Sequence, residues 1–537
     1  MLRVISLLFI GLLLLSSCSP VPSLWGEYSS PTPEFAPPIT AATGVTPPPA
    51  SSSPTPPPTS TFTSTPTLIP VETSTLGASI GSGSDPVLSE ALITPTFDVP
   101  AVLYYAQGGD TVAAVATRFG IDPSEVHAEI PLQETGLISP GTLLVMPKRL
   151  TEVTTPGGLL FPDSEVVFSG SAADFDIEAY IRSTSGRLST HREYLGSTGW
   201  NTGADEIRRL AYENSINPRL LLALLEYESR WVRGDAVDSL HRDYPMGYVN
   251  LYYKGLFGQM LWTVNQLSIA YYGWRTGELT ELRFPDGTRL RLNPQLNAGT
   301  VALQFLLSKQ HNQSQWAQMI DPDNGFLAVY SELFGDPWAD AEAKGPLLPP
   351  GLAPPTLALP FEAGARWSFT GGPHGAWEHD GAVAAVDFAP FTDHGGCDPT
   401  TTWVTAAAPG TVVRSERGVV VQDLDADGYE QTGWALVYLH IAAQDRVSEG
   451  TYLQQDDRIG HASCEGGQAT GTHLHFARKY NGEWIAADGP LPFLLSGWLV
   501  HEGAVMYKGT LTKGDQVVTA DPVGQSKSVI IRSLDDD

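Results

Sequence analysis

The sequence predicts a multidomain protein, with a disordered N-terminal stalk, a small βααβ module, an all-α domain and a C-terminal, mostly antiparallel β domain. The 537 residues are enough for three to four domains of ordinary size. Charged residues make up only 17% of the chain, whereas glycine (53) and proline (43) are abundant. That balance is typical of β-rich domains joined by extended linkers, and it excludes a coiled coil.

The charge of the chain limits its partners. It has 59 acidic and 31 basic residues, a formal net charge of -28. We expect no nucleic-acid partner, because phosphate binding needs clustered Lys and Arg side chains. Only the N-terminus contains a long apolar run, so a multi-pass membrane protein is excluded.

Residues 1–17 are typical of a signal for export. Arg3 precedes the apolar run from Val4 to Leu15, which is too short for a transmembrane helix. The run ends in Leu15-Ser16-Ser17-Cys18, which resembles the lipobox of bacterial lipoproteins. That resemblance implies a signal peptide over 1–17, acylation of Cys18 and an extracytoplasmic protein held at a membrane of the cell envelope by its lipid anchor. The alternative is an ordinary signal peptide followed by an incidental cysteine.

Residues 18–100 predict the stalk. This segment is rich in Pro, Ser and Thr, and 18 of the 43 prolines lie in the first 100 residues. It has too few large apolar side chains to offset the entropy of ordering, so we expect an extended, disordered spacer.

Residues 101–150 predict the small module. A strand over 101–105 is followed by a helical pattern, a second short helix and a closing strand. The landmarks Gly109-Asp110-Thr111, Phe119-Gly120 and Gly141 to Pro147 resemble a LysM domain. The resemblance implies a βααβ fold that binds glycans containing N-acetylglucosamine and so anchors the protein to peptidoglycan. The alternative is a LysM-like spacer.

In residues 165–345 the apolar residues recur with the period of a helix. The stretch 219–231 is apolar over most of a helix and is predicted to be buried, yet it carries Glu226 and Glu228 near its end. A desolvated carboxylate is costly and tends to take up a proton. A carboxyl group with a raised pKa is what a glycosidic general acid requires.

The run from Asn217 to Ser229 resembles the catalytic-helix motif of soluble lytic transglycosylases. The resemblance implies a lysozyme-like, all-α domain with Glu228 as its acid/base. Two later segments agree loosely with it, Gly255 to Met260 and Asn293 to Gly299. The late Tyr-Asn-Gly signature is missing near Tyr330, however. The alternative is a domain that binds glycan or only packs, with Glu228 paired to Arg230 or Arg233.

Residues 357–500 predict the β domain, because short β-type segments alternate there with Gly-, Asp- and Pro-rich turns. The predicted strands are Trp367 to Phe369, Ala384 to Phe388, Thr411 to Val413, Val419 to Gln422, Ala435 to Leu439 and Leu474 to Ala477. The segment 501–537 is treated as a tail without a usable pattern.

Four histidines and one aspartate of this domain lie in predicted strands or in a predicted turn. His473 and His475 are two apart at the start of a strand, so their side chains are expected on the same face. Asp387 stands alone in an apolar strand, where an unpaired carboxylate is costly without a cation. His374 ends a predicted Gly-Gly-Pro-His turn, and His440 ends another strand. Together they predict a His/Asp/His zinc site with one open position and two free histidines.

This pattern resembles the lysostaphin-type zinc endopeptidases that cut bacterial cell-wall peptides, in particular the β-lytic branch. Gly-Gly-Pro-His374 stands 13 residues before Asp387, and Gly471 to Phe476 matches the closing motif. The resemblance implies one Zn²⁺ held by His374, Asp387 and His475. It also implies His440 and His473 at the scissile bond, one as general base and one stabilising the oxyanion.

Two alternatives to this ligand set stay open. His379, eight residues before Asp387, is a competing zinc ligand. The domain is also compatible with a degenerate form that has lost its zinc.

The remaining cysteines and an acidic run complete the site predictions. With Cys18 acylated, Cys397 and Cys464 form an even pair, which in an exported chain is most simply a disulfide, with zinc ligation as the alternative. The run 423–428 is similar to the start of a calcium loop, with Asp423, Asp425 and Asp427 as ligands, but Trp434 stands where the bidentate Glu belongs. An acidic hairpin turn is the other reading.

These patterns together predict a membrane-anchored zinc metalloendopeptidase that hydrolyses peptide bonds in bacterial peptidoglycan. Two other functions stay open. One is a non-catalytic activator of a cell-wall amidase, which retention of His374, Asp387 and His475 disfavours. The other is a lytic transglycosylase that acts through Glu228.

Overall fold

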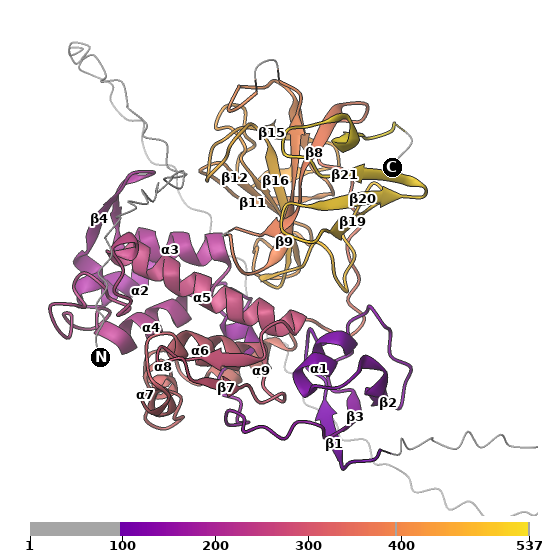
Figure 1. Ribbon diagram of the computed structural model, residues 1–537. Helices are drawn as coiled ribbons and strands as arrows, with labels where there is room; N and C mark the ends of the chain where they lie inside the picture. Colours follow the sequence, from indigo (N-terminus) through magenta and orange to yellow (C-terminus); the bar gives the residue numbers. More distant parts are fainter. Residues whose placement is uncertain (1–96, 378, 393–394, 535–537) are drawn as a thin grey trace, which may run out of the picture. The chain divides into compact units, whose positions relative to one another are not determined.

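The computed structural model describes residues 97–377, 379–392 and 395–534 (Figure 1). The predicted signal peptide, Cys18 and nearly all of the predicted stalk lie outside these residues. Within the described ranges, no helix is both long and apolar enough to cross a membrane.

The helices are α1 (Val112–Phe119), α2 (Ile177–Ser183), α3 (Gly203–Asn214), α4 (Pro218–Ser229), α5 (Leu256–Thr276), α6 (Ala298–Ser308), α7 (Gln313–Met319), α8 (Phe326–Phe334) and α9 (Pro337–Lys344). Short 3-10 helices are η1 (Pro123–Glu125), η2 (Asp163–Glu165), η3 (Arg187–Thr190), η4 (Leu251–Tyr253) and η5 (Ser526–Ser528).

The strands before residue 300 are β1 (Ala101–Tyr105), β2 (His127–Ala128), β3 (Leu143–Pro147), β4 (Arg192–Leu195), β5 (Gly199–Thr202), β6 (Glu281–Arg283) and β7 (Arg289–Arg291). Those after it are β8 (Arg366–Gly375), β9 (Val383–Pro390), β10 (Trp403–Thr405), β11 (Gly410–Glu416), β12 (Val419–Asp423), β13 (Trp434–Leu439), β14 (Tyr452–Leu453), β15 (Arg458–His461), β16 (Leu474–Tyr480), β17 (Glu483–Trp484), β18 (Leu494–Leu495), β19 (Trp498–Glu502), β20 (Gly509–Lys513), β21 (Gln516–Thr519) and β22 (Val529–Ile531).

The small module is a three-stranded sheet with one α-helix. Its strand order is β1-β3-β2, and the hydroxyl of Thr111 caps α1. The predicted second helix is only the 3-10 turn η1, so the βααβ prediction is wrong at this element. His127 then pairs with Val145, and Pro131 lacks the N–H that a continuing helix needs.

The middle domain is helical, as predicted, but it is not all-α. Helix α4 begins with Pro218 after an Asn217 cap, and its apolar residues are fully buried. Two hairpins, β4–β5 and β6–β7, add strands that the helical period did not predict. Each turns within a few residues around glycine, at Gly199 and Gly287, both with positive φ.

The C-terminal domain is built on a nine-stranded antiparallel sheet, with the order β14-β11-β12-β13-β16-β9-β8-β22 and β17 beside β16. Every strand predicted in this domain lies within one of the observed strands. The sheet is buried on both faces because alternate residues pack into two cores. Val386 and Phe476 belong to the core of the domain itself, whereas Ala385 and Ala477 belong to the core of the helical domain.

The structure extends this domain beyond the boundary predicted at residue 500. Strands β19, β20 and β21 form a sheet with β18, and β22 pairs with β8, placing Ile530 opposite Trp367. Arg532 is fully buried against Asp456. Strands β20, β21 and β22 have five, four and three residues, too few for their alternation to stand out in the sequence, which explains why 501–537 read as a tail.

Replacing Ile530 by Ala tests whether this last strand supports the domain. Ile530 is 1% exposed and Ile531 is 52% exposed. We expect Ile530→Ala to destabilise the domain by roughly 2–5 kcal/mol, because it opens a cavity beside Trp367. Ile531→Ala is the matched control and should have little effect. Thermal unfolding measures both, and equal melting temperatures for the two variants would contradict this assignment.

Candidate active site

Four neighbouring strands bring the predicted site residues together. Asp387 on β9 pairs with Gly371 on β8 and with His475 on β16, and His475 pairs in turn with Leu439 on β13, the residue before His440. The Gly-Gly-Pro-His segment is not the predicted turn but an irregular part of β8 whose register shifts on both sides of it. Because Pro373 has no N–H to donate, pairing is interrupted there and resumes at His374.

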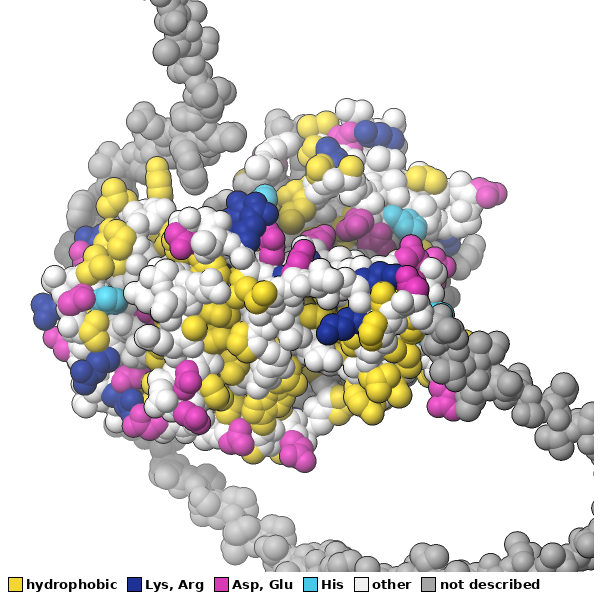
Figure 2. All heavy atoms as spheres, turned by 60° about the horizontal axis from the view of Figure 1, so that its bottom comes forward, with side chains coloured by type: hydrophobic (Ala, Val, Ile, Leu, Met, Phe, Trp, Pro, Cys, Tyr) yellow, Lys and Arg dark blue, Asp and Glu magenta, His cyan; other side chains and the backbone are white. Residues whose placement is uncertain are grey.

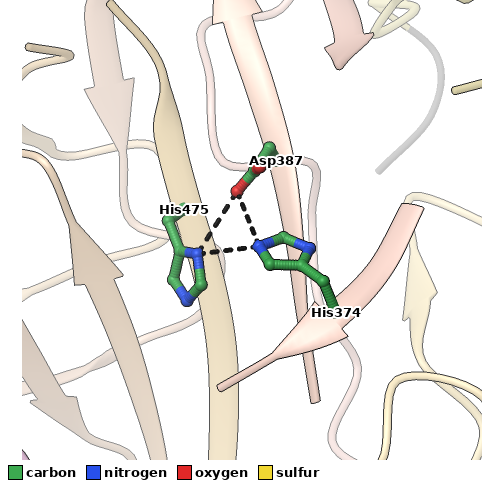
Figure 3. A group of neighbouring side chains, drawn as sticks. All are labelled: His374, Asp387 and His475. Atoms are coloured by element: carbon green, nitrogen blue, oxygen red, sulfur yellow. Dashed lines mark hydrogen bonds and ion pairs between the residues drawn. The ribbon is translucent and has the colours of Figure 1, made fainter. Parts of the chain in front are cut away.

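The side chains of His374, Asp387 and His475 converge on one point (Figure 3). The Nε2 atom of His374 lies 3.2 Å from Oδ1 of Asp387, and Nδ1 of His475 lies 3.3 Å from the same oxygen. The two imidazole nitrogens are 3.0 Å apart. All three residues are buried.

Hydrogen bonds on the far side of each ring set which nitrogen faces the centre. Nδ1 of His374 lies 2.8 Å from the carbonyl oxygen of Gly372, and Nε2 of His475 lies 2.9 Å from that of Ala376. A carbonyl only accepts, so each of these nitrogens carries the N–H, and the other nitrogen presents a lone pair inward.

Among the described residues, Asp387 Oδ1 has no hydrogen-bond partner although it is buried. Two lone pairs and a carboxylate oxygen in one buried place repel unless a cation lies between them. The donor set of two imidazoles and one carboxylate therefore fits a metal ion such as zinc.

The closeness of these three side chains also shifts their pKa values. Burial alone would raise the pKa of Asp387, but the His374 and His475 imidazoles outweigh it and hold the pKa well below its ordinary value. Burial would lower the pKa of His374, but the Asp387 carboxylate raises it overall. Burial lowers the pKa of His475. Asp387 is thus a carboxylate, the form that ligates a metal.

Two further residues shape this site, Gly371 of the Gly-Gly-Pro-His motif and Tyr507, which the sequence analysis missed. A Cβ atom on Gly371 would lie 2.5 Å from Oδ2 of Asp387, so only glycine lets β8 approach the carboxylate. The ring of Tyr507 stacks on that of His374, with centroids 4.2 Å apart. Tyr507 comes from the segment taken as a tail, where nothing in the sequence marks it.

His440 and His473 lie beside the ligand group. Their ring centroids are 4.4 Å apart, and Nε2 of His473 is 3.8 Å from Asp387 Oδ1. Nδ1 of His440 lies 2.8 Å from the carbonyl oxygen of Glu465, and Nδ1 of His473 lies 2.7 Å from that of Gly471. Burial, with the nearby His473 and His475, lowers the pKa of His440 to about 3. His440 is therefore neutral, with Nε2 able to accept a proton.

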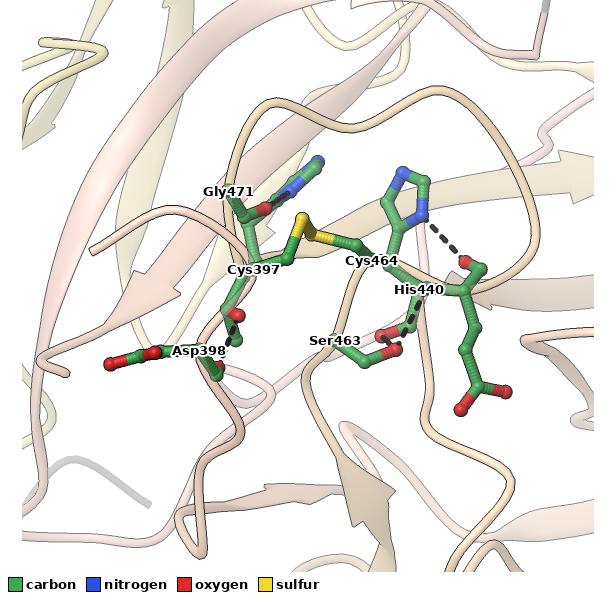
Figure 4. The surroundings of a disulfide bond; sticks show 9 residues. Cys397, Asp398, His440, Ser463, Cys464 and Gly471 are labelled. Atoms are coloured by element: carbon green, nitrogen blue, oxygen red, sulfur yellow. Dashed lines mark hydrogen bonds between the residues drawn. A yellow bond between two sulfur atoms is a disulfide. The ribbon is translucent and has the colours of Figure 1, made fainter. Parts of the chain in front are cut away.

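A disulfide between Cys397 and Cys464 joins the two segments that hold these histidines (Figure 4). Next to Cys464, Ser463 donates its backbone N–H and its hydroxyl to the carbonyl of His440, which has a positive φ. Next to Cys397, the carbonyl of Gly396 accepts the N–H of Thr472, the residue before His473. The bond thus restrains both histidines.

The other predicted site residues lie elsewhere. His379 is 78% exposed at its side chain, pairs with Asp380 and does not join the ligand group. Arg233, suggested as a partner of Glu228, pairs instead with Glu226 and Glu332. Among the described residues Glu228 forms no ion pair, and burial raises its pKa to about 7.

The fold and this ligand group define a metallopeptidase, and the comparisons name its family. Residues 394–487 match the model "Peptidase family M23", and residues 159–348 match "LasA, N-terminal domain". Protease LasA of Pseudomonas aeruginosa is 30% identical over 347 residues, which cover 61% of this chain and 75% of that protein. The chain therefore belongs to the LasA family of M23 peptidases.

Two further relatives match shorter parts of the chain. The beta-lytic metalloendopeptidase of Lysobacter enzymogenes is 26% identical over 145 residues, covering 27% of this chain and 78% of that protein. A solved structure titled as the M23 metalloprotease pseudoalterin from the deep sea is 22% identical, covering 31% of this chain and 96% of that one, with a TM-score of 0.26. The helical domain matches the N-terminal domain of LasA.

The acidic run 423–428 forms a turn. Oxygens of Asp423, Asp425 and Asp427 lie close together, but Asp423 accepts the N–H groups of Asp425 and Gly428, and Asp427 accepts that of Tyr429. These bonds satisfy the turn's own backbone, as the acidic-hairpin reading expects, and the comparisons give no support for calcium.

Replacing Gly371 by Ala tests the close approach to Asp387. We expect the new methyl group to displace the carboxylate, lowering both the metal content and the melting temperature, with a cost of roughly 1–3 kcal/mol for overpacking. Gly158→Ala is the control, because a Cβ there meets no atom within 4 Å. Elemental analysis and thermal unfolding measure the effect. Full metal content in Gly371→Ala would show that the approach is unimportant.

Removing the disulfide tests its role in holding the two histidines. For a Cys397→Ser/Cys464→Ser variant, we expect faster amide hydrogen exchange at Ser463 and Thr472, because their partners lose the restraint. We also expect a stability loss of about 4 kcal/mol from the freed loop, whose ends are 67 residues apart. The amide of Val420 in β12 is the internal control. Unchanged protection at Ser463 and Thr472 would contradict the assigned role.

Proposed function

We propose that this protein is a zinc metalloendopeptidase that hydrolyses peptide bonds in bacterial peptidoglycan. The observation that carries the proposal is the convergence of one carboxylate and two inward-facing imidazole nitrogens, with two further histidines beside them. Three protein ligands that leave a position open are typical of catalytic rather than structural zinc sites.

The family supports the substrate class. The relatives include the protease LasA and two beta-lytic metalloendopeptidases, and a solved relative of the fold is the antimicrobial peptidase lysostaphin. On the viewed face in Figure 2, Lys and Arg side chains are scattered among acidic ones and form no single basic surface. That distribution agrees with a neutral or peptide substrate better than with a nucleic acid.

The N-terminal parts would hold the enzyme at that substrate. The strand–helix–strand arrangement of residues 101–150 supports a LysM-like module that binds the glycan strands. The lipobox-like sequence at Cys18 supports a lipid anchor, although it lies outside the described residues. Binding the same polymer at a separate module raises the effective concentration of the peptidase at its substrate.

His374, Asp387 and His475 would hold the zinc ion, which, when bound, polarises the scissile carbonyl and makes water a better nucleophile. His440 is placed to act as the general base, since its Nδ1 donates to the carbonyl of Glu465, which fixes the ring and leaves Nε2 as the proton acceptor. It takes the proton of the attacking water and passes it to the leaving amine. His473 donates from Nδ1 to the carbonyl of Gly471, so its Nε2 would donate a hydrogen bond to the oxygen on which charge develops when the ring carries a second proton.

A second activity rests on one specific observation. Glu228 lies at the end of a buried helix, without an ion-pair partner among the described residues, and its pKa is raised to about 7 by burial. A carboxyl group of this kind is protonated near neutral pH, as a glycosidic acid must be. Cleavage of glycan by the helical domain is therefore the second candidate function.

Three histidine variants of the full chain, assayed on purified peptidoglycan, test these proposals. We expect His475→Ala to lose zinc and peptide cleavage together. His440→Ala should keep its zinc but cleave at least 100-fold more slowly, by the ordinary contribution of a general base, roughly 10²–10⁴. His379→Ala is the control and should be fully active, because its exposed ring is outside the group.

Mass spectrometry of the released fragments separates the alternatives. Newly freed amino termini in the stem or cross-bridge peptides support the peptidase. Anhydro-sugars that disappear in Glu228→Gln support the second candidate. A wild-type protein that binds no zinc and releases neither product, but stimulates an added amidase, would overturn both proposals in favour of an activator.

A further inference from the structure

The helical domain contains a second group of ligand-type side chains, His191, Glu193 and Glu206. One potential ligand atom from each lies within 4.8 Å of the other two. We infer that these three residues bind one divalent transition-metal ion, separate from the site in the β sheet.

Local backbone structure places the three residues together. His191 follows η3, and its carbonyl accepts the N–H of Gly203, the first residue of α3. Glu193 lies on β4, whose partner β5 runs directly into α3, so closing the hairpin returns the chain to His191. Glu206 is in the first turn of α3, which a reciprocal capping box of Thr202 and Asp205 fixes.

The group has unsatisfied polar atoms directed into it. Glu206 is only 1% exposed, and neither of its carboxyl oxygens has a hydrogen-bond partner within the described ranges. Nε2 of His191 is likewise buried without a hydrogen-bond partner in the same ranges, and it lies 3.4 Å from Oε2 of Glu193. Buried polar atoms are nearly always satisfied, so this concentration of exceptions requires an explanation.

Protonation does not supply that explanation. A neutral Glu206 would still bury two oxygens and one hydroxyl hydrogen without partners, and each unsatisfied buried group costs free energy. A cation at the centre would satisfy the oxygens of both glutamates and the nitrogen of His191 at once. One imidazole with two carboxylates suits zinc and similar transition metals, whereas calcium prefers an all-oxygen set.

The contacts of Glu193 show which helices and strands the ion would connect. Oε2 of Glu193 accepts the N–H of Leu256 at the start of α5, at 2.8 Å. A Cβ on Gly255 would clash with the same carboxylate, so glycine there permits the approach. An ion on Glu193 and Glu206 would therefore join the β4–β5 hairpin, α3 and α5, and we expect it to stabilise the helical domain.

The test counts zinc in purified full-length protein by elemental mass spectrometry after exposure to Zn²⁺ and removal of the excess. We expect the wild type to hold two ions, a His374→Ala/His475→Ala variant to hold one, and the same variant with Glu206→Gln to hold none. Adding Zn²⁺ should raise the melting temperature of the double variant but not that of the triple variant. Glu206→Gln alone should lower the wild-type count from two to one, which serves as an independent measurement.

The control is Glu213→Gln in the double variant. Glu213 is a buried carboxylate on the same helix, but Arg209 already pairs with it at 2.9 Å. This control should keep its one ion.

Three outcomes would overturn the inference: a double variant without zinc, an unchanged count on Glu206→Gln substitution, or a second ion lost instead with Asp425→Asn. The proposed peptidase site is tested separately. A single ion that Glu206→Gln removes and His475→Ala does not would support the site in the helical domain and contradict the peptidase proposal.

Discussion

The C-terminal domain is organised around one buried negative charge. Asp387 lies in the centre of a sheet that is covered on both faces, and a carboxylate there is costly unless a cation accompanies it. Its neighbours are arranged to share that cation. Two adjacent strands supply imidazoles whose lone pairs face Oδ1, and Gly371 leaves space for Oδ2. The metal chemistry that we propose is therefore a consequence of how this charge is accommodated by the fold.

The sequence could predict the parts of the site that local patterns encode. His473 and His475 show the period of a strand, Asp387 interrupts an apolar strand, and Cys397 and Cys464 are an even pair, and the structure brings each set together. Tyr507 and β22 were missed because their role depends on pairing with a strand more than a hundred residues earlier. No local hydrophobic pattern in the sequence indicates such a contact.

The helical domain shows the same limit in another form. Its apolar period correctly predicted a buried α4, but the same run of leucines suits many helical folds, so it did not identify the domain.

The helical domain also packs against the sheet of the C-terminal domain. Ala385 and Ala477 pack into the helical core, and Asp387 and His475 alternate onto that same face of the sheet. The helical domain thus covers the sheet up to the candidate active site, and Glu483 on β17 accepts hydrogen bonds from Tyr271 and Arg275 of α5.

Anomalous diffraction at the zinc absorption edge, from crystals of the full chain grown with Zn²⁺, tests the central claim most directly because it locates each ion. The account predicts a strong peak between Nε2 of His374, Oδ1 of Asp387 and Nδ1 of His475, within about 2.0–2.2 Å of each. Density without an anomalous peak at that position, or a peak ligated by other residues while these three bind no ion, would contradict it.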